Sequence, residues 1–110
     1  MEVRRGNVVL CASPGDYGKP RPAVVVQSDL FNLTHASISL CPITSDLQPA
    51  PLFRIDLAPD TENGLKKPSQ IMIDKVNSQP LKRIGGVIGH LQPEQMRTVN
   101  AALRLWLGLP

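Results

Sequence analysis

The sequence predicts a mostly β domain of the α+β class, in which a small β-barrel is followed by one C-terminal helix. Eleven prolines and eight glycines divide the chain into short segments rich in Val, Ile and Leu, which is the pattern of strands joined by turns. Apolar residues recur with helical spacing only after residue 92. With 110 residues the chain is long enough for one domain, which we expect to span residues 1–110.

The first two strands are expected at residues 7–12 and 22–27. Residues 23–26 read Ala-Val-Val-Val, and an apolar run of this length between turn residues favours a strand buried on both faces. The segment 13–20 between the two strands is polar and contains glycine and proline, so we expect a long loop there.

A single helical turn is expected at residues 28–32, with Ser28 as its cap. The next strand is expected at residues 37–41. Pro42 lacks a backbone N–H, so we expect it to end this strand or to place it at a sheet edge.

Three further strands are expected in the second half of the chain. Residues 52–57 alternate apolar and charged side chains, as a half-buried strand does. Residues 69–76 are apolar at their centre, and residues 83–88 form a short, bent strand at best because they contain two glycines. Asn63-Gly64 predicts a turn in the loop before the second of these strands.

The terminal helix is expected to begin near Pro93, with Glu94 as the acid of its first turn. Gly108 and Pro110 are expected to end it. Its apolar positions recur at spacings of three and four and predict one face packed on the barrel; they are Met96, Val99, Leu103 and Trp106.

Composition excludes several classes of protein. No apolar run approaches the roughly 20 residues of a membrane helix, and the first residues do not resemble a signal peptide, so we expect a cytoplasmic protein with no membrane partner. Cys11 and Cys41 sit in apolar runs and are expected to be reduced core residues. Neither has a His at ligand spacing, so no metal and no cofactor is expected. A net charge of +3 weakly favours a polyanionic partner.

Few residues stand out as candidates for chemistry. His35 and His90 are expected to be solvated loop residues. Arg21 is flanked by two prolines that restrict its backbone, and a guanidinium held in this way suits a phosphate, although it also suits a solvated turn. Thr44 and Ser45 follow the expected third strand and either bind a phosphate oxygen or cap the loop.

Motifs along nearly the whole chain resemble the MazF/PemK family of toxin–antitoxin ribonucleases. The matching segments occur in the order of that family, and their succession is more specific than any one of them. They read RGNVVL from Arg5, PG at Pro14, GK at Gly18, RPAVVVQ from Arg21, CPITS from Cys41, NGL from Asn63, PSQIMIDK from Pro68, RIG from Arg83 and IG at Ile88.

The resemblance implies a homodimer of SH3-like barrels that binds single-stranded RNA in a groove at the dimer interface. It also implies a metal-independent endoribonuclease that leaves 2′,3′-cyclic phosphate and 5′-hydroxyl ends, inhibiting translation and growth. The catalytic arginine and hydroxyl of the family fall on Arg21 and Thr44. Further RNA contacts are expected from the loop before Arg21 and from two later segments, namely Asp16, Tyr17, Lys19, Ser45, Asp74 and Lys75.

Several points stay open at this level. Tyr17 either stacks on a base or packs on its own barrel, and the general base is Asp16, Asp74 or water. Asn7 stands where the family commonly has an acid, and Pro20 stands where some members have His. The implied partner is an acidic, partly disordered, MazE-like antitoxin, through which operator DNA is bound indirectly. The alternatives are a CcdB-like toxin that binds gyrase without catalysis, and a degenerate member acting in antitoxin binding and autoregulation.

Overall fold

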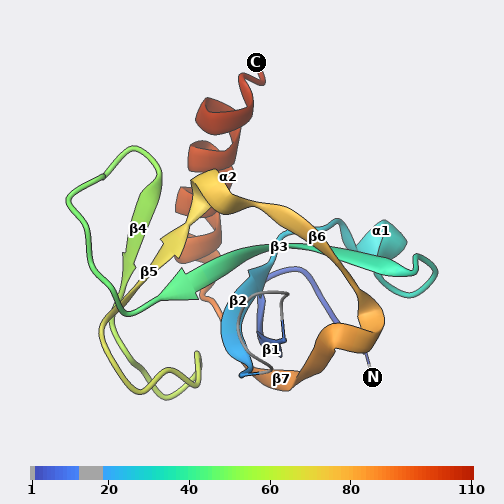
Figure 1. The fold of residues 1–110 in the computed structure, drawn as a ribbon. Helices are drawn as coiled ribbons and strands as arrows, with labels where there is room; N and C mark the ends of the chain where they lie inside the picture. Colours follow the sequence, from blue (N-terminus) through green and yellow to red (C-terminus); the bar gives the residue numbers. More distant parts are fainter. Residues whose placement is uncertain (1, 13–18) are drawn as a thin grey trace.

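The computed structural model describes residues 2–12 and 19–110. It contains an antiparallel sheet in the order β4-β5-β3-β2-β1-β7, with β6 paired to β3. The strands curl into a small barrel, and a long helix lies across one side of it (Figure 1). The predicted class, mostly β with a C-terminal helix, is confirmed. The elements are β1 (Asn7–Cys11), β2 (Arg21–Val25), α1 (Asp29–Asn32), β3 (Ser37–Thr44), β4 (Arg54–Leu57), β5 (Ser69–Met72), η1 (Ile73–Lys75), β6 (Asn77–Pro80), η2 (Leu81–Arg83), β7 (Ile84–His90) and α2 (Pro93–Leu107).

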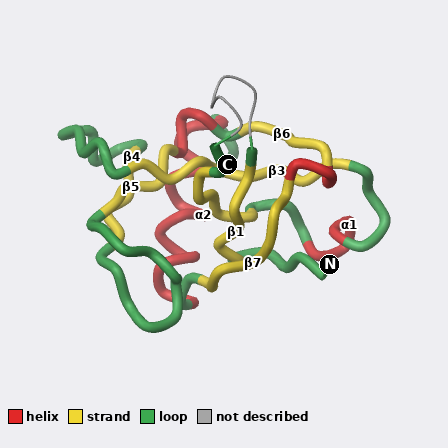
Figure 2. The backbone as a smooth tube through the Cα atoms, turned by 60° about the horizontal axis from the view of Figure 1, so that its bottom comes forward, coloured by secondary structure: helices red, strands yellow, loops and turns green. Residues whose placement is uncertain are grey.

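The long strand β3 organises the sheet because it changes partner along its length. One edge of β3 pairs with β2. Its other edge pairs first with β6, over residues 37–40, and then with β5, over residues 43 and 44. The barrel and the β4–β5 pair are therefore two parts of one sheet that share β3 (Figure 2).

The prediction that Pro42 ends its strand or lies at an edge is wrong, because β3 continues to Thr44 at the centre of the sheet. Val26 donates a 3.0 Å hydrogen bond to the Ser39 carbonyl, and hydrogen-bonding residues alternate along an antiparallel ladder. The nitrogen of Pro42 therefore faces away from β2. It lies where β3 passes from β6 to β5, so no ladder hydrogen bond is lost.

Two other strand boundaries differ from those expected. The fifth strand ends at Met72, and residues 73–75 form the 3₁₀ turn η1. The strand β6 was not predicted, because its sequence Asn-Ser-Gln-Pro has none of the apolar alternation of a strand. Strand β7 is longer than expected and pairs with β1 through two register shifts, which accommodate its bend.

Two apolar clusters hold the fold together. One is enclosed by β1, β2, β3 and β7 and includes Val9, Ala23, Val25 and Leu40. The other lies between the opposite face of the sheet and α2, where Val99 is fully buried and Met96 and Leu103 pack against it. The two cysteines divide between these clusters, as expected of small core residues.

The helix α2 begins at Pro93 and ends at Leu107, and Gly108 caps it with a φ of 69° in the left-handed region. The prediction that Gly108 ends the helix is confirmed. A capping box between Gln92 and Gln95 satisfies its first turn. The end of the helix extends beyond the sheet (Figure 1), and Trp106 is 48% exposed although Phe53 packs against it. The last turn of the helix is therefore only partly covered by the rest of the protein. None of the helices in the described part of the chain has the length and apolar character of a membrane span.

Candidate active site

A groove of about 980 Å³ opens where the ends of β2 and β3 meet the loop before β5. Its walls come from β1, β2, β3, β5, β6 and β7 together with loop residues. A second, smaller hollow of about 570 Å³ lies near α1 and is lined by residues that include Phe31 and His35. The residues that line the groove are Leu10, Cys11, Arg21, Pro22, Ala23, Leu40, Pro42, Ile43, Thr44, Ser45, Gly64, Leu65, Lys66, Lys67, Ser69, Met72, Lys75, Asn77, Gln79 and Ile88.

Arg21 enters this groove from the first position of β2. It pairs with Cys11 of β1, so the ladder fixes its backbone where the flanking prolines already restrict it. The side chain is exposed, and within the described residues no carboxylate lies within ion-pair distance of it. The guanidinium donors are therefore available to an anion in the groove.

Thr44 lies on the strand that faces Arg21. The β2–β3 ladder pairs Ala23 with Pro42, and the same register continued by two residues sets Arg21 opposite Thr44. Side chains two residues apart on a strand share a face. Arg21 and Thr44 therefore project from the face that carries Ala23 and Pro42, at the open end of the barrel.

The hydroxyl of Thr44 has a fixed partner inside the protein. Its Oγ1 accepts a 3.0 Å hydrogen bond from the backbone N–H of Asp46. This bond uses the acceptor side of the hydroxyl and leaves its proton for an acceptor in the groove. Thr44 can therefore donate a hydrogen bond to an anion that Arg21 also binds.

The buried side chain of Gln70 secures the loop that follows Thr44. Its Oε1 accepts from the Gln48 N–H at 3.0 Å, and its Nε2 donates to the Gln48 carbonyl at 3.0 Å and to Asp56 at 2.8 Å. Arg54 adds a 2.9 Å bond to the Asp46 carbonyl. Since Asp46 also donates to Thr44, this network positions the hydroxyl.

The groove is cationic. It is lined by Arg21, Lys66, Lys67 and Lys75, and no Asp, Glu or His is among the described residues of its wall. Low-dielectric walls strengthen a field of one sign. The groove therefore favours a polyanion over a neutral or cationic ligand.

Comparison with known proteins identifies the family. The sequence pattern of the PemK-like, MazF-like toxins of type II toxin–antitoxin systems matches residues 4–107. The chain belongs to the PemK/MazF toxin family. It is 38% identical over 108 residues to "Probable endoribonuclease MazF" of Mycolicibacterium smegmatis, covering 97% of this chain and 98% of the relative. It is 29% identical to "Endoribonuclease EndoA" of Bacillus subtilis, over 99% and 97% of the two chains.

Solved structures agree with the fold of this PemK/MazF chain. An endoribonuclease in complex with its cognate antitoxin, from a mycobacterial species, superposes with a TM-score of 0.82 at 23% identity and covers 98% of this chain and 97% of its own. A MazE–MazF structure from Deinococcus radiodurans superposes with a TM-score of 0.81 at 20% identity, covering 100% and 99%. At these identities the likeness shows the shared fold.

The residues expected from this family to bind RNA are only partly brought together. Ser45 and Lys75 line the groove with Arg21 and Thr44. Lys19 is exposed two residues before Arg21 but is not part of the groove wall. Asp16 and Tyr17 lie outside the described residues.

Asp74 is not placed as expected. It lies on η1 rather than at the end of a strand, and it does not line the groove. Its Oδ1 is buried without a hydrogen-bond partner. Burial raises the pKa of the Cys41 thiol to about 12; the charge of Arg5 lowers this pKa and the charge of Asp74 raises it.

Neither histidine lines the groove, and both are exposed as expected, although His90 belongs to strand β7 and not to a loop. His35 is exposed near α1, and His90 is exposed at the end of β7 with Glu62 at 3.5 Å. No cluster of three or more potential metal ligands occurs in the part of the chain that the structure describes.

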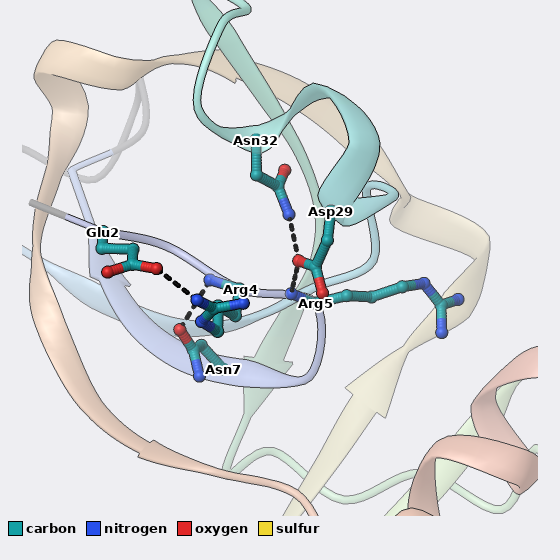
Figure 3. A network of polar contacts seen from close by, with 6 residues as sticks. All are labelled: Glu2, Arg4, Arg5, Asn7, Asp29 and Asn32. Carbon is teal, nitrogen blue, oxygen red and sulfur yellow. Dashed lines mark hydrogen bonds and ion pairs between the residues drawn. The ribbon is translucent and has the colours of Figure 1, made fainter.

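The side chain of Asn7 makes a structural hydrogen bond outside the groove. Its Oδ1 accepts from the Arg4 N–H at 2.8 Å, while Asp29 accepts from the Arg5 N–H at 2.7 Å (Figure 3). The backbone bond from Arg5 is the main reason that the pKa of Asp29 is lowered, against the opposing effect of burial. An amide oxygen at position 7 therefore fulfils the acceptor role that an acid would have, outside the groove.

Sequence reasoning missed five polar residues of the groove wall, one of which is Ser69 at the start of β5. Asn77 and Gln79 belong to the unpredicted strand β6, where they pair with Leu40 and Ile38. Lys66 and Lys67 lie in the loop after Asn63-Gly64. The only signal in the sequence was two adjacent lysines after a turn, which does not show where the loop is placed.

Proposed function

We propose that this chain is the toxin of a type II toxin–antitoxin system and cuts single-stranded RNA in the groove that holds Arg21 and Thr44. The observation that carries this proposal is their juxtaposition in a cationic groove. A guanidinium with no carboxylate partner among the described residues lies opposite a hydroxyl whose proton is available for donation. Its PemK/MazF relatives named as endoribonucleases are similar over almost the whole chain.

The reaction uses the substrate's own nucleophile. The 2′-oxygen of the RNA attacks the adjacent phosphorus, the bond from phosphorus to the 5′-oxygen breaks, and the departing oxygen takes up a proton. The products are a 2′,3′-cyclic phosphate and a 5′-hydroxyl. Negative charge accumulates on the non-bridging oxygens, where Arg21 and Thr44 donate hydrogen bonds.

The described groove wall supplies donors rather than a proton acceptor. It contains no carboxylate or imidazole within the described residues, and an arginine with a pKa above about 12 is a poor base. Asp74 is not among the residues that line the groove. The acceptor for the 2′-hydroxyl proton is therefore Asp16 or a water molecule.

Recognition of the substrate rests on the remaining polar groups. Ser45, Lys75 and Asn77 surround the reacting pair and suit phosphate oxygens and base edges of an unpaired strand. We infer that Lys19, Asp16 and Tyr17 of the preceding loop add contacts, with Tyr17 stacking on a base.

The assembly follows from the same family membership. A mycobacterial relative is described in complex with its cognate antitoxin, and a Deinococcus radiodurans relative is described as MazE–MazF. We infer an acidic, MazE-like antitoxin whose disordered segment is attracted to the cationic groove, a homodimer that places the groove near its interface, and operator binding through the antitoxin. The site of action is the cytoplasm, where messenger RNA is translated.

The test is cleavage of a defined single-stranded RNA by purified protein in EDTA, followed by analysis of the fragment ends. The wild type is expected to produce 2′,3′-cyclic phosphate ends. Arg21→Ala is expected to lose at least a hundredfold in rate, as when one oxyanion donor is removed. Arg97→Ala is the matched control, because Arg97 is exposed on α2 outside the groove.

Two results would overturn the proposal. An Arg21→Ala protein that is folded and cleaves at the rate of the control would exclude this arginine. A folded wild type that yields no fragments with any RNA would favour the non-enzymatic alternatives, gyrase binding or a degenerate subunit.

A further inference from the structure

Two lysines, Lys66 and Lys67, line the groove together with Arg21. Gly64 and Leu65 of the same loop also line it, with Ser69 of β5 and Ile88 of β7. Ile43 also lines the groove and projects from the face of β3 opposite to that of Thr44. The groove wall therefore includes residues from both faces of β3, with Arg21 contributed by β2 and the lysine pair by the loop before β5.

The loop that carries the lysines is held by a buried asparagine. Asn63 is 0% exposed. Its Nδ2 donates to the Ala58 carbonyl at 2.9 Å, and its Oδ1 accepts from the N–H groups of Leu65 at 3.0 Å and Asp60 at 3.3 Å. A buried amide satisfied on both ends fixes the turn immediately before Lys66.

Two glycines let this loop lie directly on β7. A Cβ on Gly64 would lie 2.3 Å from the Ile88 carbonyl oxygen, and a Cβ on Gly89 would lie 2.2 Å from the Glu62 carbonyl oxygen. Gly64 also has a φ of +71°, which favours glycine. His90 donates a 2.8 Å backbone hydrogen bond to Glu62. The loop is thus packed against the barrel at both of these positions.

The charges of the loop are separated by this packing. Asp60 accepts hydrogen bonds from the N–H groups of Glu62 and Asn63 within the loop, and Glu62 lies beside His90. Neither acid lines the groove. Lys66 and Lys67 are exposed in the groove wall, and within the described residues no carboxylate pairs with either of them. Two positive charges are therefore held at the groove without a counter-ion from residues 2–12 or 19–110.

We propose that Lys66 and Lys67 form a second phosphate-binding site, which holds the RNA backbone of nucleotides flanking the cut while Arg21 and Thr44 hold the scissile phosphate. The proposal rests on the proposed ribonuclease function for its substrate. A lysine binds phosphate as a point charge without reading sequence. The lysine site therefore sets the affinity for the RNA strand and the position of the strand in the groove. The chemical step is left to Arg21 and Thr44.

The test measures binding and cleavage separately. The probe for binding is a 2′-O-methyl RNA of mixed sequence, which lacks the nucleophile and stays intact. The variant is the double substitution Lys66→Ala and Lys67→Ala. The control is the pair Lys82→Ala and Arg97→Ala, which removes the same charge from exposed positions outside the groove.

The double variant is expected to bind the probe roughly tenfold more weakly than the control pair. The slope of log affinity against log salt is expected to become about 1.4 shallower, since each phosphate contact on a single strand contributes about 0.7. Cleavage of a long RNA is expected to show a raised KM with kcat within about twofold of wild type.

Equal affinities and equal salt slopes for the double variant and the control pair would overturn the proposal, because net charge alone would then explain the binding. A loss of kcat with unchanged KM would also overturn it. If the wild type binds the probe through these lysines and yet never cuts RNA, the ribonuclease function fails while the phosphate site stands.

Discussion

Replacing Thr44 tests whether the groove acts through a hydrogen-bond donor. Thr44→Val removes the hydroxyl and keeps the branched shape that a strand favours. The lost bond from the Asp46 N–H is exposed, so it lowers the free energy of unfolding by about 1 kcal/mol or less. A donor to charge that develops in the transition state is worth about 3–4 kcal/mol, so kcat is expected to fall about a hundred- to a thousandfold.

The assay is single-turnover cleavage of a short RNA, with urea denaturation of the same preparations as the measure of stability. Thr44→Ser keeps the hydroxyl and is expected to retain activity within about tenfold of wild type. The reasoning is refuted if Thr44→Val cleaves within threefold of wild type. It is also refuted if Thr44→Ser is as slow as Thr44→Val while both are folded.

Two further predictions concern the fold that holds the site. Gly89→Ala is expected to lower the free energy of unfolding by about 1–3 kcal/mol or more, because its Cβ would meet the Glu62 carbonyl oxygen at 2.2 Å. The control is Gly86→Ala, whose Cβ meets nothing within 4 Å and which is expected to cost less than about 1 kcal/mol. Urea denaturation measures both. The Cys41 thiol, whose pKa is raised from 9.0 to about 12, stays protonated in the folded chain while the unfolded chain ionises above pH 9, so stability is expected to fall as pH rises from 9 to 12. Cys41→Ala is expected to flatten this part of the profile, and an unchanged slope would contradict the assignment.

The sequence predicted the parts of the fold that depend on local patterns. The helix α2 was found from its apolar spacing and from Pro93 and Gly108, because capping and periodicity are both local properties. Strands β1 and β2 were found from short apolar runs between turns. The position of Pro42 inside a central strand was not predictable in this way, because it depends on β3 exchanging one partner strand for another. Strand β6 was missed because pairing with β3, and not composition, makes it a strand.

The same distinction between local patterns and contacts of distant segments applies to the residues of the site. Arg21 and Thr44 were named from a resemblance across the chain, and their opposition follows from the β2–β3 register. The lysine pair depends on how the loop after Asn63 lies against Gly89 of β7, a contact between distant segments. Asp74 was expected at the end of the fifth strand, but residues 73–75 leave the strand as the 3₁₀ turn η1, and Asp74 does not line the groove.

The most direct test of the central claim uses the chemistry of the substrate. Once the cut in an RNA is mapped, the same oligonucleotide is prepared with a single 2′-deoxy nucleotide on the 5′ side of that bond, and both are incubated with the protein in EDTA. Attack by the 2′-oxygen within the groove predicts that the all-ribose strand is cut and the substituted strand stays intact. Cleavage of the substituted strand at the same bond and at a similar rate would contradict the account.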